Sequence, residues 1–367
     1  MHTGVISLLF LCGFFDIMLY VELGEGDRMS KQRILIIGGT GTISTAIVGM
    51  LVKSQNIELY VVNRGHRSVP AGAQPLICDA NDVDAMQKLI GDAVFDTVID
   101  FVVYTPQQAK DRVYLFQNHT RQYIFISTVV VFNHENNFIL NEDSTQKNRF
   151  SKYGRDKAAC EDVFNQAMKK GFPVTIVRPS QTYGYDRFPL SAKGKNCWSV
   201  VSRILNDKPV IIHGDGQSIW HMMHTFDFAY NFIQLIGNMN AINRSVNLVN
   251  PDIVTWDMIY DALGKALNRK VQKVHISSEL LAMSSKYPLN DQIVGDKQFS
   301  NLYTDIVRDV LIPDFKCMID LQKGIELYTQ YIWEHAEARV EDPEFDAWCD
   351  QVIADYHAYM GRFHAKF

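Results

Sequence analysis

A tyrosine and a lysine four residues apart are the strongest candidates for chemistry in this sequence. Tyr153 and Lys157 open a predicted helix over Tyr153–Lys169, and their spacing places both side chains on one helix face. A phenol has a pKa of about 10 and is a poor base at neutral pH, but a neighbouring ammonium group favours the phenolate and lowers that pKa. Tyr153 is therefore expected to exchange a proton with a substrate hydroxyl.

Two hydroxyl groups precede this pair in the sequence. Ser127 and Thr128 lie in a predicted strand over Tyr123–Val131, about 25 residues before Tyr153. A hydroxyl at this place can hold the substrate oxygen opposite the tyrosine. The structural alternative is ordinary hydrogen bonding at the end of a strand.

A glycine-rich turn lies near the start of the chain, between a strand predicted at Arg33–Ile37 and a helix predicted at Thr45–Ser54. Glycines let the backbone turn tightly and approach a pyrophosphate, whose charge is met by the N–H groups of the following helix. Serine at position 44 replaces the third glycine of the usual pattern. The turn predicts dinucleotide binding rather than a turn without a ligand, and the residues expected to contact the cofactor are Gly38, Gly39, Thr40, Gly41, Thr42 and Ile43.

The residues after the next strand bear on which dinucleotide binds. A carboxylate about 20 residues beyond the glycine turn would contact the ribose 2′-hydroxyl of NAD. This chain has Asn63 and Arg64 there instead, and Arg64 can pair with a 2′-phosphate or stack on adenine. We therefore expect NADP or NAD as the cofactor, with a slight preference for NADP. Asp79, at the end of the third strand, is expected either to accept from the adenine amine or to cap a turn.

The elements that must position these residues alternate between apolar strands and helices. Continuous apolar strands separated by helices predict a parallel sheet covered on both faces, that is, a doubly wound α/β (Rossmann) fold. The further strands are expected at Leu59–Val62, Pro75–Cys78, Thr97–Val103 and Val174–Val177, and the further helices at Asp82–Ile90 and Gln107–Gln117.

The pattern weakens after Gly184. Asp186–Asn196 reads as a lid or substrate loop, and beyond the helix Phe226–Ile236 and the strand Val246–Val249 the chain is mainly helical. We expect residues 29–185 and 224–250 to form the NAD(P)-binding domain. Residues 186–223 and 251–367 would form a smaller, mostly helical C-terminal substrate lobe, and residues 1–28 an N-terminal extension.

Five motifs in this order and spacing resemble those of the extended short-chain dehydrogenases/reductases, in the NAD-dependent epimerase/dehydratase family. They are GGTGTIS (38–44), ISTVVVF (126–132), YGRDK (153–157), VRPSQTYG (177–184) and HGDGQ…HTFDFA (213–229). The resemblance implies that Thr128, with Ser127 beside it, supplies the catalytic hydroxyl. It also implies that Tyr153 is the acid/base and that Lys157 binds the nicotinamide ribose and tunes Tyr153. An oxidised nicotinamide is expected to act together with Lys157 in lowering the pKa of Tyr153. Pro179 and Ser180 would then flank the nicotinamide. The candidates for substrate contact are Thr182, Tyr183, Trp220 and His221.

Three departures from the family pattern narrow this expectation. Only about 25 residues separate Asp100 from Ser127, where sugar-nucleotide epimerases usually carry a longer segment. The family's arginine that grips a nucleotide-sugar diphosphate falls at Trp220, which would stack on a sugar or base, or simply pack. The shortened architecture also resembles the chloroplast stem-loop-binding proteins, which share the fold and bind RNA.

Composition sets the remaining bounds. The chain has 367 residues, 47% apolar and 21% charged, with a net charge of −5 and no basic cluster, so a nucleic-acid surface is disfavoured. Six scattered cysteines predict a reduced, cytoplasmic protein.

His221 and His224 are the nearest approach to a metal pattern, and no metal site is expected. The apolar run Val5–Val21 is short for a membrane span and contains Asp16, so membrane attachment is disfavoured and Met29 is an ordinary start.

These observations predict an NAD(P)-dependent enzyme that transfers hydride at a secondary alcohol or ketone of a sugar-like or nucleotide-sugar-like substrate. Epimerisation, dehydration and reduction all remain open as the net reaction, and a homodimer is compatible with the sequence. The alternative is a non-catalytic relative that senses nucleotides or binds RNA on the same fold.

Overall fold

The computed structural model describes residues 31–135, 138–287 and 289–364. The run Val5–Val21 and the start expected near Met29 lie outside these residues. Within the described ranges, no helix is both long and apolar enough to cross a bilayer.

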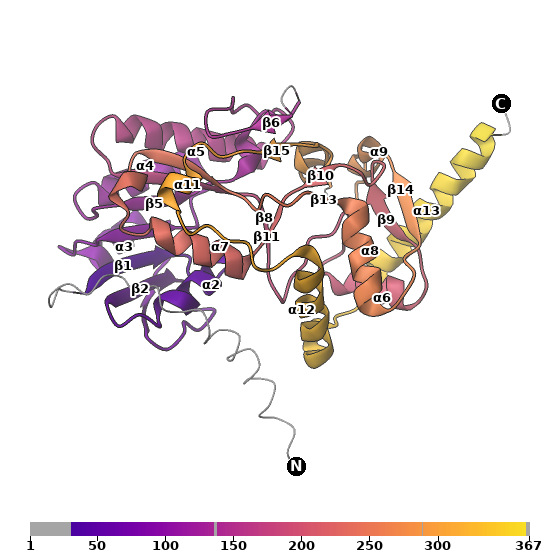
Figure 1. Ribbon diagram of the computed structural model, residues 1–367, viewed down its shortest axis with the longest axis horizontal. Helices are drawn as coiled ribbons and strands as arrows, with labels where there is room; N and C mark the ends of the chain where they lie inside the picture. The colour runs from indigo at the N-terminus through magenta and orange to yellow at the C-terminus, as the bar shows by residue number, and fades with distance from the viewer. Residues whose placement is uncertain (1–30, 136–137, 288, 365–367) are drawn as a thin grey trace, which may run out of the picture. The chain divides into compact units, whose positions relative to one another are not determined.

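Seven parallel strands form the central sheet of the unit that begins at Gln32 (Figure 1). In spatial order they are β12 (Arg244–Leu248), β7 (Val174–Pro179), β5 (Tyr123–Ile126), β4 (Thr97–Asp100), β1 (Gln32–Ile37), β2 (Ile57–Asn63) and β3 (Ala73–Ile77). The chain runs outward from β1 to β3 and then returns to β4 on the other side of β1. This reversal between β1 and β4 creates the crevice at which such sheets bind ligands. The predicted doubly wound fold is confirmed.

Helices cover both faces of this sheet. Along β1, Ile34 and Ile36 pack in one core, whereas Leu35 and Ile37 pack in the other, because successive strand residues point to opposite faces. The first core includes residues of α2 (Thr42–Leu51) and α7 (Thr225–Phe232). The second core includes residues of α3 (Val83–Ile90), α4 (Pro106–Phe116) and α5 (Lys152–Met168), helices that are labelled in Figure 1.

Two of the expected elements end earlier than the sequence suggested. The strand predicted at Tyr123–Val131 stops at Ile126, and Val129–Val131 form a 3₁₀ turn. The Thr128 side chain accepts from the Val130 amide at 3.2 Å, and this local bond favours the turn over a continued strand. The helix predicted at Phe226–Ile236 likewise ends at Phe232 and continues as a 3₁₀ turn.

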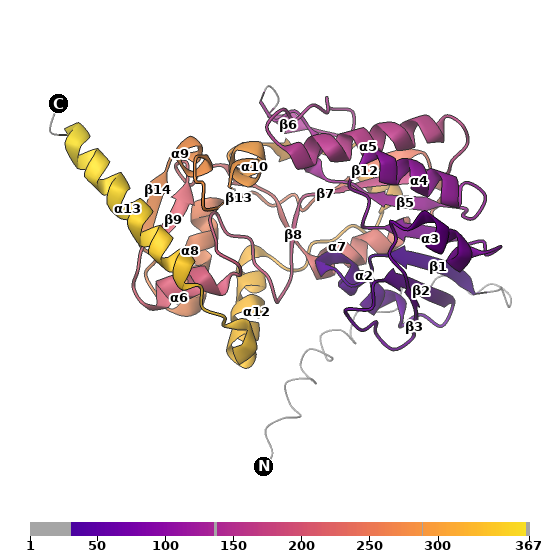
Figure 2. The ribbon, with the colours of Figure 1, turned by 180° about the vertical axis from the view of Figure 1, so that it is seen from behind.

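The C-terminal half builds a mainly helical lobe with a core of its own around Trp256, Tyr260 and Leu263 (Figure 2). Its helices are α6 (Trp198–Leu205), α8 (Trp256–Leu267), α9 (Ser278–Ala282), α10 (Asn290–Gln292), α12 (Leu321–Glu334) and α13 (Pro343–His364). Its strands are short pairs: β8 (Gln181–Tyr183) with β11 (Met222–His224), β9 (Val210–His213) with β14 (Lys273–Ile276), and β10 (Ile219–Trp220) with β13 (Val254–Thr255).

One late segment crosses back toward the sheet. Strand β15 (Leu302–Tyr303) pairs with β6 (Ile139–Leu140), and α11 (Arg308–Leu311) follows it. Leu311 and Ile312 are fully buried in the core beneath α2 and α7. The stretch 251–367 therefore contributes to both halves of the molecule.

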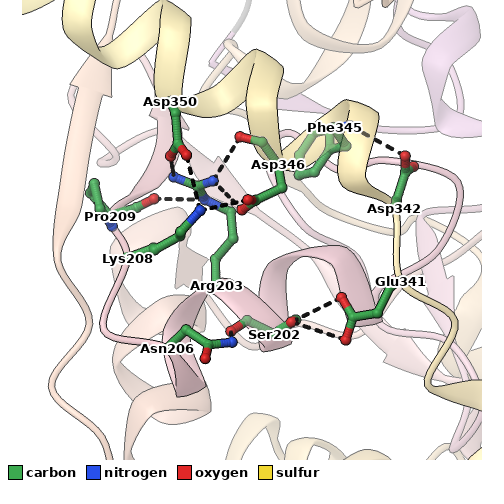
Figure 3. A network of polar contacts seen from close by, with 10 residues as sticks. All are labelled: Ser202, Arg203, Asn206, Lys208, Pro209, Glu341, Asp342, Phe345, Asp346 and Asp350. Carbon is green, nitrogen blue, oxygen red and sulfur yellow. Dashed lines mark hydrogen bonds and ion pairs between the residues drawn. The ribbon is translucent and has the colours of Figure 1, made fainter.

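A polar network fastens α13 to α6 inside the lobe (Figure 3). The buried Arg203 guanidinium contacts Asp346 at 2.5 Å and Asp350 at 2.7 Å, and it also donates to the Pro209 carbonyl at 2.9 Å. Lys208 bridges the same two carboxylates. The partners lie far apart in the sequence, so these are long-range contacts that hold α13 against α6.

Candidate active site

A cavity of about 530 Å³ opens at the C-terminal ends of β1, β5 and β7 and is walled on its other side by the lobe. It gathers most of the residues singled out from the sequence. They are Gly38, Gly41, Thr42, Ile43, Ser127, Thr128, Tyr153, Lys157, Pro179, Ser180, Thr182, Trp220 and His221.

The glycine-rich turn has the geometry of a cofactor cradle. Gly38 has φ +83°, and a Cβ atom there would lie 2.6 Å from Val102 Cγ1, so a side chain does not fit. The Ser44 hydroxyl donates to the Gly38 carbonyl at 2.7 Å and accepts from the Gly41 amide at 2.8 Å. Serine in the third glycine position thus ties the two ends of the turn together. Helix α2 begins directly after Gly41, so its N-terminus faces the turn and suits a pyrophosphate.

A second cavity of about 470 Å³ adjoins this turn and holds the residues expected at the adenosine end. Asn63, Arg64 and Asp79 line it together with Thr40. Asp79 also accepts from the Asn81 amide at 3.0 Å, which is the turn role considered as its alternative.

Two basic residues of this second cavity were missed from the sequence. His66 and Arg67 line it beside Arg64, and Arg67 donates to the Thr40 carbonyl at 2.8 Å. The signal lay in the run NRGHR (63–67), of which the sequence analysis used only the first two residues. This end of the cleft is therefore more basic than Arg64 alone indicated.

Tyr153 lies at the start of α5, whose first turn is capped by Ser151 through a 3.0 Å bond to the Gly154 amide. Burial is the main cause that raises the pKa of the Tyr153 phenol, the nearby Tyr104 adds to the rise, and a hydrogen bond with Thr128 opposes it. Tyr153 still exposes 40% of its surface. The lowered pKa expected from the sequence requires an oxidised nicotinamide as well as Lys157, and in the protein without a cofactor burial is the dominant influence.

Lys157 donates its hydrogen bonds to backbone carbonyls. Its ammonium donates to the Val103 carbonyl at 2.7 Å and to the Ile126 carbonyl at 2.8 Å, and it lies 4.8 Å from the Tyr104 ring centroid. The side chain is buried, and burial lowers the pKa of Lys157 to about 8. Lys157 thereby ties the end of β5 to the loop after β4 on either side of the crevice.

The Ser127 hydroxyl is hydrogen-bonded to a buried carboxylate. It donates to Glu161 at 2.5 Å, and Glu161 forms a buried ion pair with Arg178 at 2.6 Å. Both partners are almost wholly inaccessible to solvent. Of the two candidate hydroxyls, Thr128 is the one that contacts Tyr153.

The candidate substrate residues separate into two groups. Thr182, Trp220 and His221 line the catalytic cavity, whereas Tyr183 does not. The Tyr183 ring packs edge-on against Phe188 and His224 and lines a different cavity.

Trp220 and His221 are nearly enclosed by protein. The Trp220 indole packs on Trp256 at 5.4 Å, and its Nε1 has no partner among the described residues. The two His221 nitrogens face the carbonyls of Asn250 and Asn301 at 2.9 and 3.1 Å, and burial lowers the pKa of His221. Within the described ranges, no group of three His, Cys, Asp or Glu side chains is arranged to hold a metal ion.

Several further cavity residues were not singled out from the sequence. Most come from segments distant from the motifs, with no local pattern to mark them. They are Tyr104, Arg187, Asp291, Asp296 and Tyr303.

Comparisons with known proteins agree with this arrangement. The model of the NAD-dependent epimerase/dehydratase family matches residues 34–248, which is more than half of the chain. The chain is 24% identical over 264 residues to 2′-dehydrokanamycin reductase from Streptomyces kanamyceticus, covering 68% of this chain and 71% of that protein. It is also 24% identical over 255 residues to a chloroplast stem-loop binding protein from Arabidopsis thaliana, covering 65% of this chain and 64% of that protein.

Among solved structures, a similar fold is that of UDP-glucuronic acid 4-epimerase from Bacillus cereus in complex with UDP-glucuronic acid and NAD. The identity is 18%, the TM-score is 0.65, and the match covers 83% of this chain and 99% of the epimerase. The family match, the sheet topology and the order of the motifs lead to one conclusion: this chain belongs to the NAD-dependent epimerase/dehydratase family and is an enzyme of the extended short-chain dehydrogenase/reductase type.

Proposed function

We propose that this enzyme transfers hydride reversibly between NADP(H) and a secondary alcohol or ketone of a sugar-like substrate. The observation that carries the proposal is the meeting of the glycine-rich turn with Thr128, Tyr153 and Lys157 in one cavity. A nicotinamide cofactor, when bound, supplies or accepts the hydride. The chain must then hold the cofactor, orient the substrate and move one proton.

Different residues of the cavity are proposed to carry out these tasks. The amides around Gly38–Ile43 and the N-terminus of α2 would receive the pyrophosphate, and Lys157, Pro179 and Ser180 would surround the nicotinamide half. Ser180 suits this role because its buried hydroxyl lacks a partner among the described residues. Tyr153 would donate its proton to the carbonyl oxygen of the substrate, with the Thr128 hydroxyl bonded to the same oxygen.

The protonation state of Tyr153 favours one direction of the reaction. Burial raises the pKa of Tyr153, so the protein by itself keeps the phenol protonated at neutral pH. A protonated phenol is ready to act as an acid, which reduction of a ketone requires. Oxidation of an alcohol requires the phenolate, which the positive charge of an oxidised cofactor would favour.

The preference for NADP rests on the basic rim of the adenosine cavity. Arg64, His66 and Arg67 line it where a carboxylate would otherwise select NAD. The family is NAD-dependent, and the solved relative described above holds NAD. The basic rim supports the further step to NADP, since guanidinium groups pair well with phosphate.

The substrate is proposed to be a sugar ring without a nucleotide diphosphate. Trp220 stands where the family's diphosphate-binding arginine would be, and it is buried. A relative named for reduction of 2′-dehydrokanamycin supports a glycoside ketone as the substrate class. The described cysteines are all free thiols, which suits the cytoplasm.

The test is the variant Tyr153→Phe, which removes one oxygen and preserves the ring. Purified protein is first analysed by mass spectrometry for co-purified ligand, and sugar ketones and alcohols are then assayed for hydride exchange with NADPH or NADP. Turnover should fall by at least about 100-fold, while the fold and cofactor affinity survive. Thr128→Val should cost less, and Lys157→Met should weaken cofactor binding as well as turnover.

Normal turnover of Tyr153→Phe on a true substrate would show that the catalytic assignment is wrong. If no substrate exchanges hydride with the bound cofactor while RNA binds tightly, the binding-protein alternative replaces the enzymatic one.

A further inference from the structure

Asp296 brings a carboxylate to the catalytic cavity from a π-helix, Ile293–Lys297. π-Helical turns are rare and frequently occur at functional sites. This turn is docked on the segment that leads into α5, where Asn148 donates to the Gly295 carbonyl at 2.8 Å. A Cβ atom on Gly295 would lie 2.9 Å from Ser151 Cβ, so the backbone approaches as closely as a glycine allows. The docking fixes Asp296 beside the helix turn that carries Tyr153.

The Asp296 carboxylate differs from its neighbour Asp291 in having nothing to bind. Asp291 accepts from the Lys152 amide at 2.6 Å and so caps α5. Within the described residues, no hydrogen bond or ion pair reaches the side chain of Asp296. Lys297, the next residue, points its ammonium to the carbonyls of Leu190 and Ser191 at 3.0 and 3.2 Å.

The other cations around the cavity do not supply a partner either. Lys157 is bonded to two backbone carbonyls. Arg187 lines the cavity but forms no ion pair with Asp296. The Asp296 side chain is half-buried and faces the cavity without a cationic partner among the described residues, and this partial burial raises the pKa of its carboxyl to about 7. A cation arriving with the ligand would favour the ionised form and hold the carboxylate charged.

We propose that Asp296 binds an amino group of the substrate and thereby selects an aminated sugar ring. The inference rests on the proposed function, because it names the substrate class of the same cavity. Asp296 and Tyr153 line the same cavity, so the amino group would lie on the sugar that undergoes the reaction. A charge-assisted hydrogen bond is worth about 1.5–3 kcal/mol, or roughly a tenfold or greater difference in affinity.

The test measures binding by the full chain loaded with NADP. The probes are methyl glucosides that carry a single amino group at C2, C3, C4 or C6, with the neutral methyl glucoside as reference. Calorimetry on the wild type should show at least one aminated probe binding roughly tenfold or more tightly than the reference. Asp296→Asn should erase that preference without weakening the neutral probe, and Asp296→Glu should restore part of it.

Asp309→Asn is the matched control, because it removes one negative charge from an exposed side chain outside the cavity. It should leave the preference unchanged. Equal binding of aminated and neutral probes by the wild type would overturn the proposal, and this result does not depend on whether any variant folds. A preference that persists in Asp296→Asn would overturn it as well. Binding is measured without turnover, so failure of the Tyr153→Phe test is a separate result that bears on the proposed function alone.

Discussion

The sheet half and the lobe of this enzyme are held together in different ways. Strands such as β4 and β5 are buried at every residue and joined to their neighbours by parallel backbone ladders. The lobe has only short strand pairs, and its last helix is fastened by ion pairs to Arg203 of α6 and to Lys208 in the loop that follows α6. The sheet half has one continuous set of backbone ladders, whereas the lobe lacks such a set and is held by its apolar core and by ion pairs between side chains.

The difference carries over to the site. The glycine-rich turn and the motif residues Thr128, Tyr153 and Lys157 come from the sheet half and its covering helix. Asp296, Trp220 and Tyr303 come from segments that follow β7 in the sequence. The half proposed to bind the cofactor is therefore positioned by regular structure, and the residues that reach the cavity from the other half are positioned by long-range packing.

The largest effect is expected from Gly41→Asp in the cofactor turn. Gly41 is the N-cap of α2, where aspartate is a favoured cap, so the helix should persist. A carboxylate beside the pyrophosphate should weaken NADP binding on the order of 100-fold or more. Calorimetry checks this, with Gly49→Asp in the same helix as the control, because a Cβ there meets no atom within 4 Å. Undiminished affinity in a folded Gly41→Asp protein would contradict the cradle.

Arg203→Met tests the lobe instead. It removes a buried guanidinium with two carboxylate partners, Asp346 and Asp350, whose side chains are 39% and 48% exposed and can be rehydrated. The free energy of unfolding should fall by about 1.5–3 kcal/mol, with NADP affinity little changed. Lys208→Met, which removes a half-exposed ammonium from the same carboxylates, should cost at most about 1 kcal/mol. Equal losses in denaturant titrations of the two variants would show that burial of Arg203 contributes nothing.

Arg64→Ala and Arg67→Ala address cofactor choice within the sheet half. A lost contact with the 2′-phosphate should weaken NADP by roughly tenfold or more in either variant. Arg64→Ala should spare NAD. Arg67→Ala should also weaken NAD slightly, because Arg67 supports the glycine turn through Thr40. Titrations of each protein with NADP and with NAD measure these affinities. A wild type that binds NAD more tightly than NADP would refute the NADP assignment.

The smallest effect concerns the pH dependence contributed by Asp296. Its pKa rises from 3.8 in the unfolded chain to about 7 in the folded protein, so the folded state holds the proton more tightly. The stabilisation is present below about pH 4 and is lost as the pH rises through 7. The titratable groups that interact electrostatically with this carboxylate are Lys297, Asp291, Tyr153 and Tyr303.

Asp296→Asn should therefore melt at a progressively higher temperature than the wild type as the pH increases from 4.5 to 8. Thermal melts of both proteins in matched buffers measure this difference. Asp227, whose pKa burial raises to about 6, is present in both proteins and cancels from the comparison. A melting difference that does not change with pH would remove the evidence for an unpaired carboxylate.

Sequence by itself predicted the alternating strands and helices, the glycine turn and the pairing of Tyr153 with Lys157, whereas the choice of Thr128 over Ser127 came from the family resemblance. The first three features are local: apolar runs, a turn between a strand and a helix, and a four-residue spacing on one helix. It also indicated a basic adenosine end through Arg64. Such features depend on residues that are close together in the chain, so they can be predicted without knowing the fold.

Only the tertiary structure decided which side chains face the substrate. Thr182 and Tyr183 are consecutive residues of β8, and alternation along a strand sends one to the cavity and the other away from it. The engagement of Ser127 with Glu161 and the raised pKa of Tyr153 likewise depend on burial. Asp296 lies more than 100 residues from Tyr153 in the sequence, and only the docking of its π-helix on α5 brings the two together. Contacts between such distant segments leave no periodic trace in the sequence, because they depend on how the elements pack rather than on which elements form.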